Sequence, residues 1–158
     1  MHSRKQHTLP SPNASAAKPP APDFDTLSKG DLHHLADRLS LGDSAALATC
    51  IAFIEAETRG VWHGRARAMM CRRLKHCTLS PAQRTRLVAC ITERFRSGHF
   101  SEQFRDQLRL ALHLDPERVL AVANSFLYDS RDYVRRHAAW LLARLAEANE
   151  NAEPIRLL

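Results

Sequence analysis

Apolar residues recur along the chain with the spacing of amphipathic helices. In the stretch DSRDYVRRHAAWLL, Val134, Ala138, Leu141 and Leu142 follow the i, i+4, i+7, i+8 pattern that places side chains on one helix face. The sequence has no long alternating run of Val, Ile or Thr, which would favour a strand. The pattern therefore predicts an all-α protein with helices near residues 29–40, 43–57, 60–76, 81–97, 101–114, 116–128 and 130–149.

Capping residues stand at the expected starts of these helices. Ser28 with Asp31, and Ser80 with Gln83, have the spacing of capping boxes. Pro81 suits the first helical position because its fixed φ angle is already helical. The other predicted caps are Asp43, Ser101, Asp115 before Pro116, and either Asp129 or Ser130.

The first 27 residues differ in composition from the rest. The segment TLPSPNASAAKPPAPD is rich in Pro, Ser and Ala, and it offers too little apolar surface to offset the entropy of ordering. We therefore expect a disordered tail over residues 1–27, with a docking or targeting segment as the alternative. Residues 28–158 are expected to form a helical repeat domain.

The last two predicted helices, residues 116–149, resemble a HEAT repeat of the short, PBS-lyase type. That family has an apolar first helix, a turn with Asp, and a second helix that opens with Val-Arg and has a small residue a turn later. The matching residues here are Asp129, Val134, Arg135 and Ala138, followed by Leu142 and Leu145.

Two earlier helix pairs match more loosely. In residues 81–114, the residues that correspond to Val134, Arg135, Ala138 and Leu142 are Phe104, Arg105, Leu108 and Leu112. In residues 43–76, the residues that correspond to Val134, Ala138, Leu141 and Leu142 are Trp62, Ala66, Met69 and Met70. The resemblance implies a short α-solenoid of about three HEAT-like antiparallel helix pairs, in which each pair touches only its neighbours. The unequal spacing of the pairs leaves a plain helical bundle as the alternative.

Positive charge is concentrated in one window. The chain has a net charge of +6, and residues 58–92 contain eight Lys or Arg residues and no Asp or Glu. If the second helices of successive pairs lie side by side, these cations would line one face with those of the last helix. The candidate binding residues are Arg65, Arg67, Arg72, Arg73, Arg131, Arg135, Arg136 and Trp62.

This basic face favours a non-catalytic adaptor or scaffold that binds an acidic protein partner, in line with the scaffolding role that the resemblance implies. The alternative is a nucleic-acid-binding subunit that contacts the phosphate backbone rather than the bases. Trp62 and Trp140 would then stack on bases, although such residues often fill the gap between helices. A solvated face, or pairing with Glu55, Glu57 or Asp106, would leave the arginines without a binding role.

Other chemistry has little support in the sequence. No nucleophile elbow or phosphate-binding glycine loop is present, so no enzyme and no cofactor are expected. The four cysteines and nine histidines lack metal-ligand spacing, and the cysteines are expected to be reduced. No apolar run is long enough to cross a bilayer, which favours a cytoplasmic protein. Oligomers could form through the ends of the helix stack.

Overall fold

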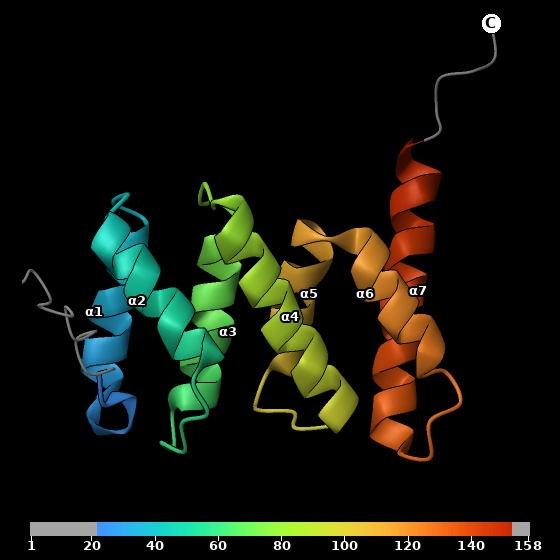
Figure 1. Ribbon diagram of the computed structural model, residues 1–158, viewed down its shortest axis with the longest axis horizontal. Coiled ribbons are helices and arrows are strands. Elements are labelled where there is room, and N and C mark those ends of the chain that lie inside the picture. Colours follow the sequence, from blue (N-terminus) through green and yellow to red (C-terminus); the bar gives the residue numbers. More distant parts are fainter. Residues whose placement is uncertain (1–21, 153–158) are drawn as a thin grey trace, which may run out of the picture.

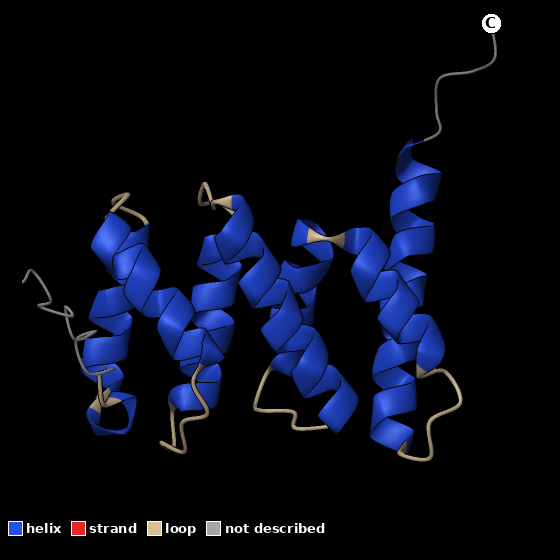
Figure 2. Cartoon of the chain, viewed as in Figure 1, coloured by secondary structure: helices blue, strands red, loops and turns tan. Residues whose placement is uncertain are grey.

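The computed structural model describes residues 22–152, and every regular element in this range is helical (Figure 2). The prediction of an all-α protein with seven α-helices is confirmed. Residues 1–21 of the predicted tail and residues 153–158 lie outside the described range. The elements are the 3₁₀ helix η1 (Phe24–Thr26), α1 (Lys29–Leu39), α2 (Ser44–Glu55), α3 (His63–Leu74), α4 (Pro81–Ser97), α5 (Phe104–Leu114), α6 (Pro116–Ser125) and α7 (Asp132–Ala152).

Most predicted caps form the expected hydrogen bonds. Ser28 and Asp31 make a reciprocal capping box at α1, and Ser80 and Gln83 make another at α4. Asp43 accepts from the N–H of Ala46 at α2. Asp115 accepts from the N–H of Arg118 at α6, where Pro116 follows directly. These side chains satisfy N–H groups that the first helical turn leaves without a partner.

Three predicted helix starts are wrong. The helix expected from residue 60 begins at His63, and no side-chain hydrogen bond from the described residues caps it. Ser101 does not cap α5: the N-cap is Gln103, in the left-handed region at φ 57°, and the Ser101 hydroxyl accepts instead from the side chain of Gln107. The last helix begins at Asp132 rather than at residue 130, because Asp129 holds the N–H and guanidinium of Arg131 in the preceding loop.

Packing against the core also begins earlier than residue 28. Phe24 in η1 is buried, and its ring meets the ring of Phe53 edge-on at a centroid distance of 5.5 Å. Asp23 caps this short helix by accepting from the N–H of Asp25. Asp25 accepts in turn from the N–H of Arg59, so both Phe24 and Asp25 connect residues 24–26 to the rest of the fold.

Consecutive helices pack in pairs, and alternate helices lie side by side. α1 packs against α2 and α3, α3 packs against α5, and α2 and α6 pack against α4. α6 and α7 form the last pair. In Figure 1 the even-numbered helices cross in front of the odd-numbered ones. The connections between helices lie alternately at the two edges of this arrangement.

The core lies between these two layers and is made of the predicted apolar stripes. In α7, Val134, Ala138 and Leu141 are buried, while Leu142 is only partly covered. At the positions of these three residues, α5 buries Phe104, Leu108 and Ala111. In the α2–α3 pair, Ala66 and Met69 are buried and Trp62 is half-buried. The fully buried side chains include Phe53, Phe95, Leu87, Ile91 and Leu110.

Candidate binding surface

Three arginines of the acid-free window connect α3 to its neighbours. Arg73 pairs with Asp37 of α1 (2.7 Å), and Arg72 pairs with Asp106 of α5 (2.5 Å). Arg65 pairs with Glu102, just before α5 (2.7 Å). The window has no acid of its own, so each of these arginines takes a carboxylate from an adjacent segment. Each pair is partly exposed, and such pairs stabilise a fold only by about 0–1 kcal/mol.

Arg67 and Trp62 do not lie on a common exposed face with these arginines. Arg67 is only 5% exposed, and its guanidinium donates to the carbonyl of Ala56 (2.8 Å) and to the hydroxyl of Thr58. Trp62 is half-buried beside the ring of His33 and the ammonium of Lys29. These contacts agree with the interpretation that Trp62 fills a gap between helices rather than stacking on a base.

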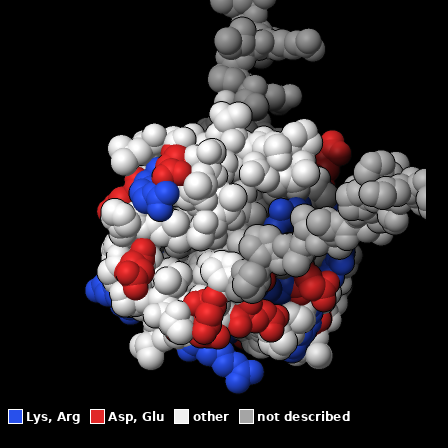
Figure 3. All heavy atoms as spheres, turned by 60° about the vertical axis from the view of Figure 1, so that its left-hand side comes forward, with Lys and Arg blue, Asp and Glu red and all other residues white. Residues whose placement is uncertain are grey.

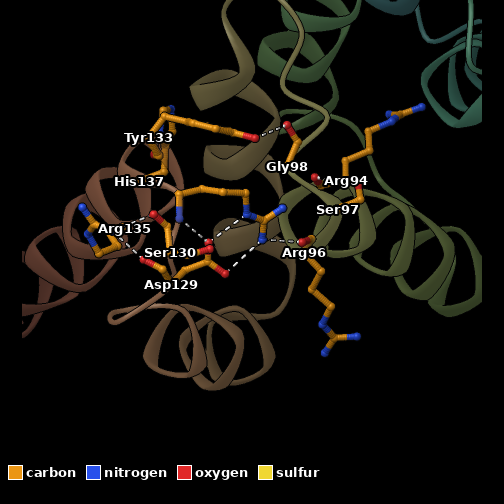
Figure 4. A network of polar contacts seen from close by, with 10 residues as sticks. Arg94, Arg96, Ser97, Gly98, Asp129, Ser130, Tyr133, Arg135 and His137 are labelled. Carbon is orange, nitrogen blue, oxygen red and sulfur yellow. Dashed lines mark hydrogen bonds and ion pairs between the residues drawn. The ribbon is translucent and has the colours of Figure 1, made fainter.

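The arginines at the start of α7 hold the loop before it. Arg131 makes a forked contact with the carboxylate of Asp129 (2.8 and 3.0 Å) and donates to the carbonyl of Arg96 at the end of α4 (Figure 4). Arg135 donates to the carbonyls of Asp129 and Ser130. Arg136, the most exposed of the three, pairs with Asp132 (2.9 Å). Arg131 and Arg135 therefore connect the α6–α7 loop to α4 and to α7.

The same network requires a glycine at the end of α4. Gly98 caps the helix at φ 75°, and its carbonyl accepts from the hydroxyl of Tyr133 (3.1 Å; Figure 4). A Cβ atom at Gly98 would lie 2.5 Å from that hydroxyl and 2.6 Å from Arg131. The left-handed backbone and this close approach together select glycine.

The network predicts an unusually acidic carboxyl group at Asp129. The hydrogen bonds from Arg131 lower the pKa of Asp129 from 3.8 to about 2. A lowered pKa in the folded state means that the stabilisation from Asp129 is fully present above pH 3.8 and is lost as the pH falls through about 2. In an NMR titration of the side-chain carboxyl carbon, we expect Arg131→Gln to return the pKa of Asp129 towards 3.8. An unchanged low pKa in that variant would show that the guanidinium of Arg131 is not the cause.

A second group of cations surrounds Trp140, and none of them is among the binding residues predicted from the sequence. Arg105 and Arg109 of α5 and Arg144 of α7 place their guanidinium carbons 5.2, 5.3 and 5.4 Å from the centre of the Trp140 ring. Arginine over an aromatic face is attracted by the ring quadrupole. Because Trp140 comes from α7 and two of the arginines from α5, this cluster joins helices that follow each other in the odd-numbered layer.

Arg109 links this cluster to α3. Asp106 accepts from both Arg109 (2.7 Å) and Arg72 (2.5 Å), so one carboxylate serves two guanidinium groups. Beside it, a cleft of about 320 Å³ is lined by Arg72, Lys75, His76, Asp106 and Arg109. We call the combined surface the Trp140 face, consisting of Arg72, Lys75, Arg105, Asp106, Arg109, Trp140, Arg144 and Glu147.

Positive charge is in excess on the Trp140 face. Its cations are Arg72, Lys75, Arg105, Arg109 and Arg144, whereas its carboxylates are Asp106 and Glu147, the latter 3.8 Å from Arg144. Of the candidates predicted from the sequence, only Arg72 and Trp140 belong to this face. The i, i+4 spacings of Arg105 with Arg109 and of Trp140 with Arg144 are visible in the sequence. Their meeting depends on how α5 and α7 pack, which local spacing does not reveal.

The α1–α2 end of the molecule presents a different surface. In Figure 3, uncharged residues occupy most of its centre, and charged residues of both signs lie around the margin. This view shows no extended patch of one sign among the residues it colours. If oligomers form through the ends of the helix stack, this largely uncharged surface at the α1–α2 end would be one of the contacts. Such oligomers stay a prediction.

Two of the four cysteines, Cys50 and Cys71, are fully buried. Burial raises the pKa of Cys50 to about 12 and also raises the pKa of Cys71, so both thiols are held in the protonated, unreactive form. Between residues 22 and 152, no group of three or more His, Cys, Asp or Glu side chains is placed to hold a metal ion. Within the same part of the chain, no helix combines the length and apolar character needed to span a bilayer.

Comparison with models of protein families, with curated proteins and with solved structures gives no match for this chain.

Proposed function

We propose that the protein is a non-catalytic binding module in which HEAT-like helix pairs stack as a short solenoid. Two features support the stack. Most helices pack against the next helix, and α1 with α3, α3 with α5, α2 with α4 and α4 with α6 pack as alternate helices. The buried stripe also recurs in α3, α5 and α7. In such a stack the odd-numbered helices form a continuous surface. The Trp140 face lies on that surface and is the proposed binding site.

We propose an acidic protein segment as the ligand of the Trp140 face. The observation that carries this proposal is the convergence of three guanidinium groups on one half-buried indole ring. Arg and Trp are the residue types that dominate binding energy at protein interfaces. Their attraction to the ring also preorganises the arginines, which reduces the entropy lost when a carboxylate binds.

Nucleic acid is the second candidate, because an aromatic ring among arginines can also stack with a base. The charge pattern makes it the weaker one. Asp106 and Glu147 lie within the Trp140 face and would repel a continuous row of phosphates. A protein segment can place its acidic residues next to Arg105 and Lys75 and carry uncharged residues opposite Asp106 and Glu147.

The test is fluorescence anisotropy with a labelled peptide in which Glu alternates with Gly. The variant Arg105→Gln with Arg109→Gln should weaken peptide binding about tenfold, since each lost charged contact is worth roughly 0.5–1 kcal/mol. The matched control is Arg96→Gln with Arg118→Gln, which removes two exposed charges from α4 and α6 in the other layer. Equal weakening in both variants would mean that only net charge matters and that the Trp140 face is not the site.

A further inference from the structure

A separate groove opens where the α2–α3 and α4–α5 connections approach each other. It measures about 500 Å³ and is lined by Glu57, Thr58 and Arg59, by Arg67 and Arg94, and by residues 98–101. Arg67 comes from α3 and Arg94 from the last turn of α4. Arg59 is exposed in the loop before α3, and its backbone N–H donates to Asp25. None of these residues belongs to the Trp140 face.

Arg67 and Arg94 share one neutral acceptor. Both donate to the carbonyl of Ala56, at 2.8 and 3.2 Å, so the two guanidinium groups are held within reach of the same oxygen atom. Their other acceptors are also uncharged: Thr58 for Arg67, and Gln107 for Arg94. Within residues 22–152, neither arginine has a carboxylate within 4.0 Å, in contrast to the α3 arginines Arg65, Arg72 and Arg73.

The charges of Arg67 and Arg94 are therefore not neutralised by a nearby carboxylate, and one of their N–H donors has no acceptor. Burial, and then repulsion from Arg94, lower the pKa of Arg67 to about 10. The Nε atom of Arg67 is buried and has no hydrogen-bond partner among the described residues. Buried donors without a partner are rare in folded proteins, because losing water without gaining an acceptor is costly.

We propose that this groove is an oxyanion site, in which Arg67, Arg94 and Arg59 bind a carboxylate or phosphate group. Guanidinium groups bind both anions with paired, charge-assisted hydrogen bonds. An anion here would relieve the repulsion between two arginines that the fold holds together. Glu57 lines the same groove and keeps its net charge low, so the site suits one anionic group rather than a polyanion. The proposal does not depend on the function of the Trp140 face.

The experiment is an NMR titration of the ¹⁵N-labelled full chain with two small probes. One probe is N-acetylglutamate α-amide, which offers a side-chain carboxylate, and the other is inorganic phosphate, with chloride keeping the ionic strength constant. We expect saturable shifts in the backbone amides of Gly98, His99 and Ser101 and in the Nε–Hε signals of Arg67 and Arg94. The probe that saturates at lower concentration identifies the preferred oxyanion.

Matched variants locate the site. Arg94→Gln should abolish the saturable shifts, whereas Arg96→Gln, an equal loss of charge on the same helix, should preserve them. In Figure 4 the side chains of Arg94 and Arg96 leave α4 in different directions. Because Arg94→Gln also removes internal hydrogen bonds, Arg59→Gln provides a variant outside the packed structure. It should weaken binding about two- to fivefold, as expected for one exposed charged contact.

Two results would overturn the proposal. If neither probe gives saturable shifts in the wild-type chain, Glu57 rather than a ligand balances the charge of the groove. If Arg94→Gln and Arg59→Gln both bind the probes as tightly as Arg96→Gln does, the anion binds elsewhere on this basic protein.

Discussion

Replacing Phe95 by alanine is expected to destabilise the protein by about 3–5 kcal/mol, the usual cost of deleting a buried aromatic side chain. Phe95 is 1% exposed, and its ring contacts Phe100 at 5.8 Å and Phe126 at 5.5 Å between centroids. It therefore joins α4 to the α4–α5 connection and to the end of α6. The cavity left by alanine would weaken the packing of the last helix pair against the helices before it.

The measurement is urea unfolding followed by far-ultraviolet circular dichroism. Tyr128→Ala is the control, since Tyr128 is 94% exposed and its loss should change the free energy of unfolding by less than about 0.5 kcal/mol. In a stack with contacts only between neighbours, Phe95→Ala should also broaden or split the transition, because α6 and α7 would unfold more independently. A loss of stability no larger than that of the control would contradict the packing described for Phe95.

The second large effect is expected at Asp106, with opposite signs for stability and binding. This carboxylate is 11% exposed and accepts from both Arg72 and Arg109. Asp106→Asn removes the shared charge and should destabilise the fold by about 1–2 kcal/mol, a value reduced by the solvent that reaches both arginines. The same change raises the net positive charge of the Trp140 face. Its affinity for an acidic peptide should therefore increase about two- to fivefold, the worth of one exposed charge.

Thermal unfolding and peptide anisotropy would measure these two effects on the same variant. Asp37→Asn is the matched control, because it removes an exposed carboxylate that pairs with Arg73 on α3, outside the Trp140 face. It should change both quantities only slightly. If Asp106→Asn lowered stability and also lowered peptide affinity, Asp106 would be part of the ligand-binding arrangement rather than a neutralising partner of the arginines.

The helices were predictable because their signals are local. Capping boxes at Ser28 and Ser80, together with the regular apolar stripes, fix where most helices begin and which face is buried. The wrong starts of α5 and α7 arise where a cap-type residue has another partner available. Ser101 accepts a hydrogen bond from the side chain of Gln107, and Asp129 accepts one from Arg131. Neither contact follows from the residue preferences at helix caps.

The candidate site was less predictable because its contacts join distant segments. The acid-free window is a real feature of the sequence, but Arg65, Arg72 and Arg73 meet carboxylates about 30 or more residues away through helix packing. Pairing with acids elsewhere was an alternative reading of the window, and Asp106 and Glu55 do pair with Arg72 and Arg86. The clusters around Trp140 and Ala56 depend on the same long-range packing.

The most direct test of the proposed function is an anisotropy titration of the wild-type chain at low and near-physiological salt. The ligands are the labelled Glu–Gly peptide and labelled single- and double-stranded DNA and RNA. We expect the peptide to bind more tightly than any of the nucleic acids at near-physiological salt. Tighter binding of nucleic acid, falling steeply as salt rises, would contradict the acidic-protein account and favour contacts with phosphates. Binding of none of these ligands, even at low salt, would remove the Trp140 face as a binding site for acidic partners.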